Sequence, residues 1–228
     1  NNHLKNVTII NSCAVTAEAE KKVSYEIRKA KKNNPNNKII VTGCAAQISP
    51  IKYQALKEVD LVIGNKEKLL NSTWKKVNYS KSIQVDNILK ETSVVPANVE
   101  KFDGKSRAFI EIQQGCDHRC TFCIIPYGRG NNRSVPAEKI VNRIQKIVNN
   151  GYKEVVLTGV DITDYGKDLP KKPSLSNLIK KILTLVPELK QLRLSSIDCA
   201  ELTEDFWPLL LEERLMPHFH LSLQAGNN

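Results

Sequence analysis

Long apolar runs, glycine and proline are all scarce in this sequence, and each scarcity excludes a class of protein. No stretch approaches the roughly 18 apolar residues that a helix needs to cross a bilayer. The amino-terminal residues lack the charged and then apolar layout of a secretion signal. Ten glycines and ten prolines among 228 residues exclude collagen and low-complexity disorder. We therefore expect a cytoplasmic protein that has no membrane partner.

Acidic residues are also in the minority, because 24 Asp and Glu face 34 Lys and Arg and leave a net charge of +10. Residues 1–100 carry 16 basic and 9 acidic residues, and residues 101–228 carry 18 and 15. This balance is compatible with a polyanionic partner such as RNA. Lysine-rich helix faces are, however, more often solvated surface than a nucleic-acid footprint.

The length allows one large or two modest domains, each able to bury a core without disulfides. The first residue is Asn rather than Met, which is compatible with processing or with a piece of a longer chain.

The first part of the chain alternates short β-branched segments with helical patterns. Thr16 is placed to cap a helix over 17–33, in which Val23, Ile27 and Ala30 recur at helical spacing. Alternating strands and helices predict a parallel sheet with right-handed crossovers. The expected strands are 7–11, 38–41 and 60–63, and further helices are expected from Pro50 and over 66–76.

Residues 77–105 have no strong period and contain Pro96, so we expect them to connect two domains through one or two irregular strands. Strands and helices then alternate again. The expected strands are 108–113, 154–158, 191–195 and 218–223, and the expected helices are 136–150, 174–185 and 204–213. The predicted domain limits are 1–78 and 105–228, with a linker over 79–104.

Four strand units suit a βα barrel, but a closed barrel needs more strands, and the last strand would be an unprotected parallel edge. We therefore expect a truncated chain that lacks at least two further strand–helix units.

Six cysteines lie at positions 13, 44, 116, 120, 123 and 199. Without an export signal, clustered thiols indicate metal binding or redox chemistry rather than disulfides. Three and then two residues separate Cys116, Cys120 and Cys123 in one loop. Three thiolates in a compact loop suit three corners of a four-iron cluster and leave one iron open to a small molecule. A structural zinc site fits poorly, because it takes four ligands and no second ligand pair lies at finger spacing.

The loop resembles the signature of radical S-adenosylmethionine (SAM) enzymes, which place it after the first strand of a βα barrel. The surrounding segments most resemble the tRNA threonylcarbamoyladenosine methylthiotransferases, within the methylthiotransferase family. The similar segments are Phe109–Gly130 with Arg133 and Ser134, Asn11–Glu20, Val41–Gln47, Leu157–Ile162 and Leu194–Asp198. Together with the strand pattern, the resemblance implies an α/β fold in which a flavodoxin-like parallel α/β domain precedes a partial radical SAM βα barrel.

The resemblance also implies two 4Fe-4S clusters and SAM as cofactors. Cys116, Cys120 and Cys123 match the ligands of the SAM-binding cluster, whose open iron takes the amino and carboxylate groups of SAM. Reduction then breaks the sulfonium and yields a 5'-deoxyadenosyl radical, a step that belongs to the cofactor.

Cys13 and Cys44 match two of three ligands of an auxiliary cluster that delivers sulfur. Both follow expected strands, at the edge of an open α/β sheet where ligands collect. The family's first ligand lies upstream of Cys13, where this sequence has no cysteine. The alternative for Cys13 and Cys44 is a pair of buried free cysteines. Cys199 matches no ligand position, and we expect it to be structural.

Five residues at the carboxyl ends of the barrel strands are candidates for binding SAM, because functional groups of such barrels gather there. They are Gly159, Asp161, Ser195, Ser196 and Gln224. A turn or capping role remains an equal alternative for each of them.

Three residues after the cysteine loop are candidates for binding the substrate. Arg129 and Arg133 carry forked donors that suit a phosphate or a SAM carboxylate, and Tyr127 offers a ring that can stack on a base. Surface arginines and a tyrosine that excludes water are the alternatives. No catalytic residue is assigned beyond the cluster ligands.

The leading hypothesis is a transferase that adds a methylthio group to N6-threonylcarbamoyladenosine next to the tRNA anticodon. Such a base lies in a single-stranded loop, where it can be offered to a pocket. The expected partners are the tRNA anticodon loop and an electron donor such as flavodoxin or ferredoxin. The alternatives are isopentenyladenosine or a ribosomal protein as substrate, or a non-catalytic metal-cluster module that binds RNA. The RNA-binding module usual after the barrel is absent, so we expect this chain alone to be impaired.

Overall fold

The computed structural model describes residues 6–75, 81–95, 104, 106–222 and 226, which form two compact units. The first unit runs to Glu91 and also contains residues 117–131, and the second contains residues 92–116 and the chain from 132 onwards. The segment that carries Cys120 and Cys123 is therefore part of the first unit, although it lies within the second unit's stretch of sequence. The domain limits placed at residues 78 and 104 stay a prediction.

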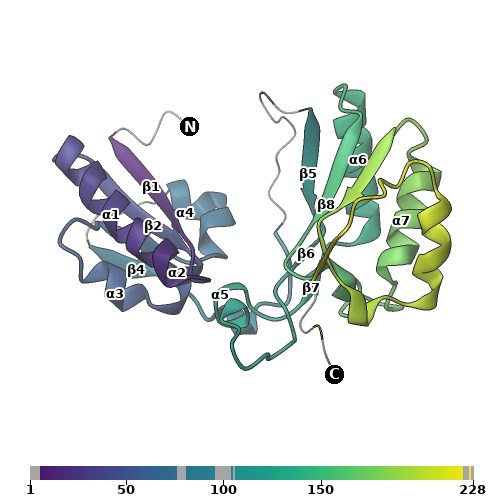
Figure 1. Ribbon diagram of the computed structural model, residues 1–228. Helices are drawn as coiled ribbons and strands as arrows, with labels where there is room; N and C mark the ends of the chain where they lie inside the picture. The colour runs from purple at the N-terminus through teal and green to yellow at the C-terminus, as the bar shows by residue number, and fades with distance from the viewer. Residues whose placement is uncertain (1–5, 76–80, 96–103, 105, 223–225, 227–228) are drawn as a thin grey trace. The chain divides into compact units, whose positions relative to one another are not determined.

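The first unit is built on a four-stranded parallel sheet in the order β1–β2–β3–β4 (Figure 1). Its strands are β1 (Val7–Ser12), β2 (Lys38–Gly43), β3 (Leu61–Ile63) and β4 (Ser82–Gln84). The predicted parallel sheet is confirmed. Strand β4 lies in the segment expected to connect two domains, and it instead completes the sheet, because its backbone pairs with that of β3.

Helix α1 (Ala17–Asn33) connects β1 to β2 and agrees with the sequence-based prediction at both ends. The Thr16 side chain accepts a hydrogen bond from the backbone N–H of Ala19, at 3.1 Å, and caps the helix. Val23 and Ile27 are buried against the sheet residues Ile39 and Val41. The remaining helices of the first unit are α2 (Cys44–Ile48), α3 (Pro50–Gln54), η1 (Glu67–Leu69), α4 (Asn71–Lys75), η2 (Ile88–Lys90) and α5 (Ile125–Arg129).

The single helix predicted over 66–76 is wrong for the residues described. Leu70 is extended and separates the 3-10 turn η1 from the short helix α4. Asn71, Ser72 and Thr73 follow it, and such side chains compete for backbone hydrogen bonds in a helix interior. The spacing of the apolar residues alone does not indicate this interruption.

The second unit has a three-stranded parallel sheet in the order β5–β8–β9, with α6 and α7 alongside it (Figure 1). Isoleucines of α6 and leucines and isoleucines of α7 bury against these strands in one core. The elements are β5 (Arg107–Glu111), α6 (Ala137–Asn149), β8 (Glu154–Thr158), α7 (Leu175–Leu185) and β9 (Gln191–Leu194). The strand–helix alternation predicted for this part is confirmed.

Shorter pieces continue the strands of the second unit. The antiparallel pair β6 (Gln113–Gln114) and β7 (Arg133–Ser134) follows β5, so the strand expected over 108–113 ends earlier, at Glu111. The parallel pair β10 (Ser196–Asp198) and β11 (His220–Ser222) follows β9. The 3-10 turns are η3 (Ile162–Asp164), η4 (Cys199–Glu201) and η5 (Glu204–Leu211).

The helix expected over 204–213 is a 3-10 helix, η5, rather than an α-helix. Pro208 lies inside it. Proline has no N–H to donate and its ring collides with the carbonyl one turn earlier, so an α-helix is disfavoured there. Among the described parts of the chain, no helix is both long and apolar enough to span a bilayer.

Candidate metal centre

Two thiols lie at the carboxyl edge of the first unit's sheet. Cys13 directly follows β1, and Cys44 is the first residue of α2, directly after β2. The preceding residues, Ser12 and Gly43, are partners in the register of the two strands. Cys13 is exposed and Cys44 is half-buried. The predicted position of both thiols at neighbouring strand ends is confirmed, and a pair of buried cysteines does not describe them.

The turn that presents Cys44 depends on glycine. Gly43 has a φ of 98°, and a Cβ at this position would collide with the backbone of Ser12. The Ser12 hydroxyl donates to the carbonyl oxygen of Thr42 at 2.6 Å and accepts from the backbone N–H of Ala46 at 3.0 Å. One buried side chain therefore joins the end of β1 to both sides of the turn.

The sulfur of Cys44 receives two side-chain donors. The Nε of Arg129 lies 3.1 Å from the Cys44 Sγ, and the Nδ2 of Asn65 lies 3.8 Å from it. The same Nδ2 donates to the carbonyl oxygen of Gly128 at 2.6 Å, which holds α5 against α2. Donors of this kind stabilise negative charge on sulfur, so the surroundings of Cys44 suit a thiolate that binds a metal.

Cys120 and Cys123 belong to the first unit, in a turn where the Cys123 N–H donates to the Cys120 carbonyl oxygen at 2.9 Å. Cys116 belongs to the second unit. None of the three cysteines forms a disulfide among the described residues, Cys120 is exposed, and Cys116 and Cys123 are half-buried. The donor set thus fits an iron–sulfur cluster chemically, and the convergence of its three sulfurs stays a prediction.

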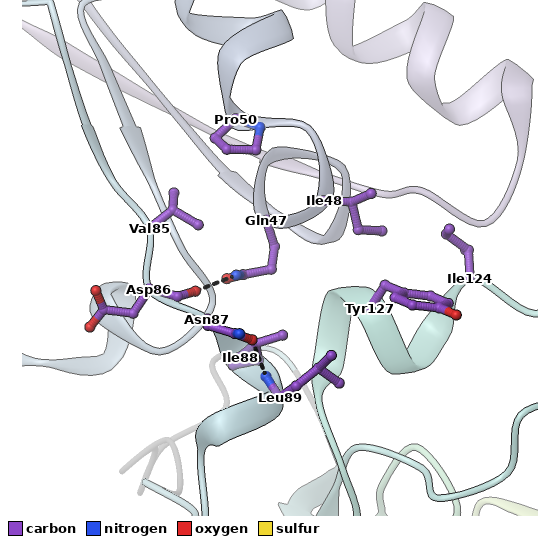
Figure 2. A pocket seen from close by; sticks show the side chains of 10 residues that line it. All are labelled: Gln47, Ile48, Pro50, Val85, Asp86, Asn87, Ile88, Leu89, Ile124 and Tyr127. Atoms are coloured by element: carbon purple, nitrogen blue, oxygen red, sulfur yellow. Dashed lines mark hydrogen bonds between the residues drawn. The ribbon is translucent and has the colours of Figure 1, made fainter.

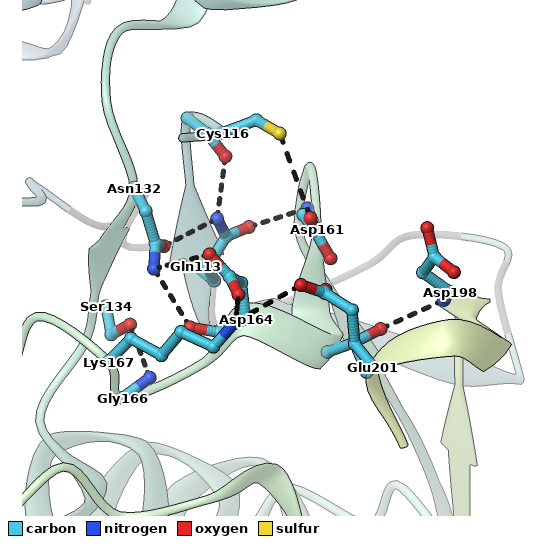
Figure 3. Close-up of polar contacts among 12 residues, drawn as sticks. Gln113, Cys116, Asn132, Ser134, Asp161, Asp164, Gly166, Lys167, Asp198 and Glu201 are labelled. Atoms are coloured by element: carbon cyan, nitrogen blue, oxygen red, sulfur yellow. Dashed lines mark hydrogen bonds and ion pairs between the residues drawn. The ribbon is translucent and has the colours of Figure 1, made fainter. Parts of the chain in front are cut away.

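In the second unit, Cys116 lies beside the loop that follows β8 (Figure 3). Its Sγ is 3.7 Å from the Oδ2 of Asp161. Gly159 opens this loop and has no room for a side chain, because a Cβ would lie 2.8 Å from the Oε1 of Gln113. Gly159 and Asp161, both predicted to bind SAM, therefore both contact Gln113, which lies just before the cysteine loop.

The other predicted SAM-binding residues follow β9. The Ser195 hydroxyl is buried and has no hydrogen-bond partner among the residues that the structure describes. Ser196 is exposed, and its hydroxyl lies 3.2 Å from the Nδ1 of His220. Gln224 lies outside the described residues. Cys199 is exposed, and its Sγ lies 3.9 Å from the carbonyl oxygen of Ser222.

The three predicted substrate residues have different surroundings. Tyr127 is 53% exposed and, with Ile124 and Ile48, lines a largely apolar pocket of about 570 Å³ in the first unit (Figure 2). Arg129 directs its Nε at Cys44. Arg133, on β7, is only 3% exposed, and its Nη2 lies 3.4 Å from the Oε1 of Gln114. Tyr127 is the one of the three that offers most of its surface.

Sequence reasoning missed two buried amides that support these thiols. Asn65 follows β3, and Gln113 precedes the cysteine loop; they are 6% and 0% exposed. The rule that polar residues at the carboxyl ends of parallel strands face the ligand edge applies to Asn65 and could have found it. Gln113 lies at the end of an alternating strand pattern, and only its three-dimensional partners distinguish it from an ordinary strand residue.

Comparisons with known proteins agree with this arrangement. Residues 110–228 match the family model described as the radical SAM superfamily, and residues 2–64 match that of the uncharacterized protein family UPF0004. The chain is similar in fold to the radical SAM methyltransferase TsrM of Kitasatospora setae, with a TM-score of 0.61 at 15% identity over 94% of this chain and 47% of that one.

Two curated relatives are similar over almost the whole chain. The threonylcarbamoyladenosine tRNA methylthiotransferase MtaB of Rickettsia prowazekii is 54% identical, over 99% of this chain and 53% of its own length. The protein of the same name from Aquifex aeolicus is 38% identical, over 99% of this chain and 55% of its own length. The chain thus spans about half the length of the curated relatives it matches.

Proposed function

The chain belongs to the radical SAM superfamily, and we propose that it acts as a tRNA methylthiotransferase on N6-threonylcarbamoyladenosine next to the anticodon. The names of its relatives support this substrate, because the 54% and 38% identities run through both units. The cysteine pattern supports the reaction type, since one trio of thiols follows the first strand of the second unit and two further thiols lie at strand ends of the first.

The proposed cofactors are SAM and two 4Fe-4S clusters. Cys116, Cys120 and Cys123 would hold the cluster that binds SAM, and Cys13 and Cys44 would contribute two ligands to the auxiliary cluster. When bound, these groups supply a 5'-deoxyadenosyl radical and the sulfur to be transferred.

The chain's own residues orient these groups. Arg129 and Asn65 donate toward the sulfur of Cys44, and the guanidinium of Arg129 also offsets the charge of a thiolate there. Ser195 offers a buried hydroxyl without a partner among the described residues, Asp161 lies beside Cys116, and Gly159 packs against Gln113 in the same loop as Asp161, which is the support for assigning all three to SAM. Ser196 and Gln224 remain candidates for the same role on sequence grounds.

The proposed partners are the anticodon loop of tRNA and an electron donor such as flavodoxin or ferredoxin, both in the cytoplasm. Tyr127 is our first candidate for stacking on a base, because its ring is exposed at the apolar pocket. Arg129 and Arg133 remain candidates for contacts with phosphate. The net charge of +10 favours a polyanionic substrate.

The observation that carries the proposal is the spacing of Cys116, Cys120 and Cys123 in a chain of this superfamily, and its test is the Cys120→Ala variant. The chain is reconstituted with iron and sulfide without oxygen, and iron and 5'-deoxyadenosine are measured. We expect Cys120→Ala to abolish SAM cleavage, because the cluster loses a ligand. Cys199→Ala is the matched control, since Cys199 is also exposed but matches no ligand position.

Two outcomes would overturn the proposal. A Cys120→Ala protein that still cleaved SAM would remove the cluster assignment, and a wild-type protein that bound zinc without cleaving SAM would favour a non-catalytic metal module. Mass spectrometry of tRNA nucleosides from a deletion strain decides the substrate. If the deletion strain instead lacks the methylthio group on isopentenyladenosine or on a ribosomal protein, that molecule is the substrate in place of threonylcarbamoyladenosine.

A further inference from the structure

The side chain of Gln113 is fully buried between three segments of the second unit (Figure 3). These segments are the start of the cysteine loop, the residue before β7, and the loop that follows β8. A single planar carboxamide contacts all three. Its two ends contact different segments, which makes the role of each end separable.

The amide nitrogen of Gln113 holds the start of the cysteine loop. Its Nε2 donates to the carbonyl oxygen of Gly115 at 2.7 Å and to the Oδ1 of Asn132 at 2.8 Å. The Gly115 carbonyl belongs to the peptide unit that continues into Cys116. The position of the Cys116 backbone is therefore tied to the nitrogen end of this carboxamide.

The amide oxygen of Gln113 holds the loop that follows β8. Its Oε1 accepts from two consecutive backbone N–H groups, those of Val160 at 2.9 Å and Asp161 at 2.8 Å. Gly159 lies against the same oxygen, at a distance that leaves no space for a Cβ. The carbonyl oxygen of Gln113 would also be only 3.0 Å from that Cβ. This loop is therefore seated on Gln113 both through hydrogen bonds and through close packing.

Among side chains of this size, only a carboxamide both donates to the Gly115 carbonyl and accepts from the N–H groups of Val160 and Asp161. A carboxylate of the same shape would accept from Val160 and Asp161 but would offer no proton to the Gly115 carbonyl. A thioether of similar volume would fill the space and leave all these polar groups without this partner, which is unfavourable above all for the buried carbonyl of Gly115 and side chain of Asn132.

We propose that Gln113 is a positioning residue that sets the place of the 159–161 loop relative to Cys116 and thereby the affinity of the protein for SAM. The part that concerns SAM rests on the proposed function. The part that concerns the loop is a property of the polypeptide alone, so the two can fail separately.

The experiment compares Gln113→Met and Gln113→Glu with the wild-type chain. Gln191→Met is the control for the loss of a glutamine side chain, because Gln191 is exposed at the start of β9. The first measurement is amide hydrogen exchange at Val160 and Asp161 in the metal-free protein. The second is SAM affinity by equilibrium dialysis after anaerobic reconstitution, together with iron content and the electron paramagnetic resonance change that SAM causes.

We expect the two variants to separate the two ends. In Gln113→Met, exchange at Val160 and Asp161 should accelerate about tenfold, because each N–H loses its acceptor. In Gln113→Glu the acceptor remains, so exchange at these amides should stay within about twofold of wild type. Both variants should bind SAM about tenfold more weakly with unchanged iron content, because mutation of supporting hydrogen-bond partners typically changes binding by this amount.

Several results would overturn the inference. Equal acceleration of exchange in both variants, or acceleration spread evenly over the second unit, would show a general loss of stability instead of a local role. Unchanged SAM affinity in both variants, in a protein whose wild type binds SAM, would remove the positioning role. If neither variant folds, the wild-type exchange decides: Val160 and Asp161 must exchange more slowly than the exposed Gly159, and equal rates would refute the contact.

Failure of the proposed function has a different signature. The wild-type chain would then neither bind nor cleave SAM after reconstitution. The exchange pattern of Val160 and Asp161 would still support or refute the hold of Gln113 on the loop, because it is measured without metal.

Discussion

Each unit presents a cysteine shortly after a strand, Cys44 directly after the parallel strand β2 and Cys116 after the short antiparallel strand β6, but the two units support it in different ways. In the first unit, side chains from elsewhere in the unit donate directly to the sulfur of Cys44. In the second unit, a carboxamide beneath the loop binds the backbone on the way to Cys116. The first arrangement acts on the charge of the ligand atom, and the second acts on the place of the loop. A substitution in the first unit should therefore alter the properties of the thiolate, whereas one in the second unit should alter geometry.

The largest expected effect on stability distinguishes Gly43, in the first unit, from Gly159, in the second unit. Gly43→Ala should destabilise the first unit by about 3 kcal/mol, because the backbone is left-handed there and the added Cβ meets the backbone of Ser12. Gly159→Ala should cost less, about 2 kcal/mol, because the backbone is not left-handed there and the added Cβ meets its nearest atoms, on the side chains of Gln113 and Ile162, at 2.8 Å, a less severe overlap than that with the Ser12 backbone at Gly43. Urea unfolding, monitored by hydrogen exchange in each unit, measures the loss of stability in both variants.

If Gly159→Ala were as damaging as Gly43→Ala, the loop after β8 would be held as rigidly as the turn at Gly43. The distinction between a rigid turn and a loop seated on a side chain would then be lost.

A smaller effect is expected from the buried asparagines that support each edge. Asn65→Ala should destabilise the first unit by about 2 kcal/mol, because the Gly128 carbonyl loses its donor. Asn132→Ala should destabilise the second unit by a similar amount, because Asn132 accepts from Gln113 and donates to the carbonyl oxygen of Asp164. Asn36→Ala is the control, since Asn36 is exposed in a turn.

Hydrogen exchange resolved by unit is the measurement for these two variants. Each should accelerate exchange in its own unit and leave the other unit within experimental error. An Asn65→Ala variant that loosened both units equally would contradict the assignment of its contacts to the first unit.

Much of the fold follows from local patterns in the sequence. The helix over 17–33 was predicted with both its ends, because a Thr cap and a regular apolar face point to the same structure. The parallel order of the first three strands and the strand-end position of Cys13 and Cys44 followed from strand–helix alternation. In these places one short segment contains all the information needed.

The parts that were missed depend on partners distant in sequence. Strand β4 has little pattern of its own, and it is a strand because β3 offers an open edge. The Arg129 side chain reaches Cys44 across 85 positions, and Gln113 meets Val160 across 47. Pro208 is a local signal that η5 is not an α-helix, and it is the one feature among these that the sequence itself contains. Contacts of this kind have no periodicity, so single-sequence patterns do not contain them.

The smallest expected effect concerns the buried acids of the two units. Asp164 is 3% exposed and forms an ion pair with Lys167. Glu67 is 8% exposed, and neither of its carboxylate oxygens forms a well-aligned hydrogen bond among the described residues, so the backbone N–H groups of Glu67 and Asp86 offset only part of the effect of burial. Burial raises the pKa of Glu67 above its ordinary value of 4.5, and the nearby Asp86 carboxylate raises it further. The ionised form of Glu67 is therefore unfavourable in the folded protein.

Glu67→Gln should consequently stabilise the first unit at neutral pH, by about 1 kcal/mol. With a raised folded-state pKa, the native protein binds more protons than the unfolded chain above pH 4.5, so wild-type stability falls as the pH rises through this window. The variant has no such proton, and its advantage should grow from pH 4.5 upwards and then level off. Urea unfolding at a series of pH values measures this. Asp164→Asn is the control with the opposite sign, because it breaks an ion pair. An advantage of Glu67→Gln that did not vary with pH would show that folding leaves the pKa of Glu67 unchanged, and an advantage that shrank as the pH rose would show that folding lowers it; either result would contradict the inferred effect of burial.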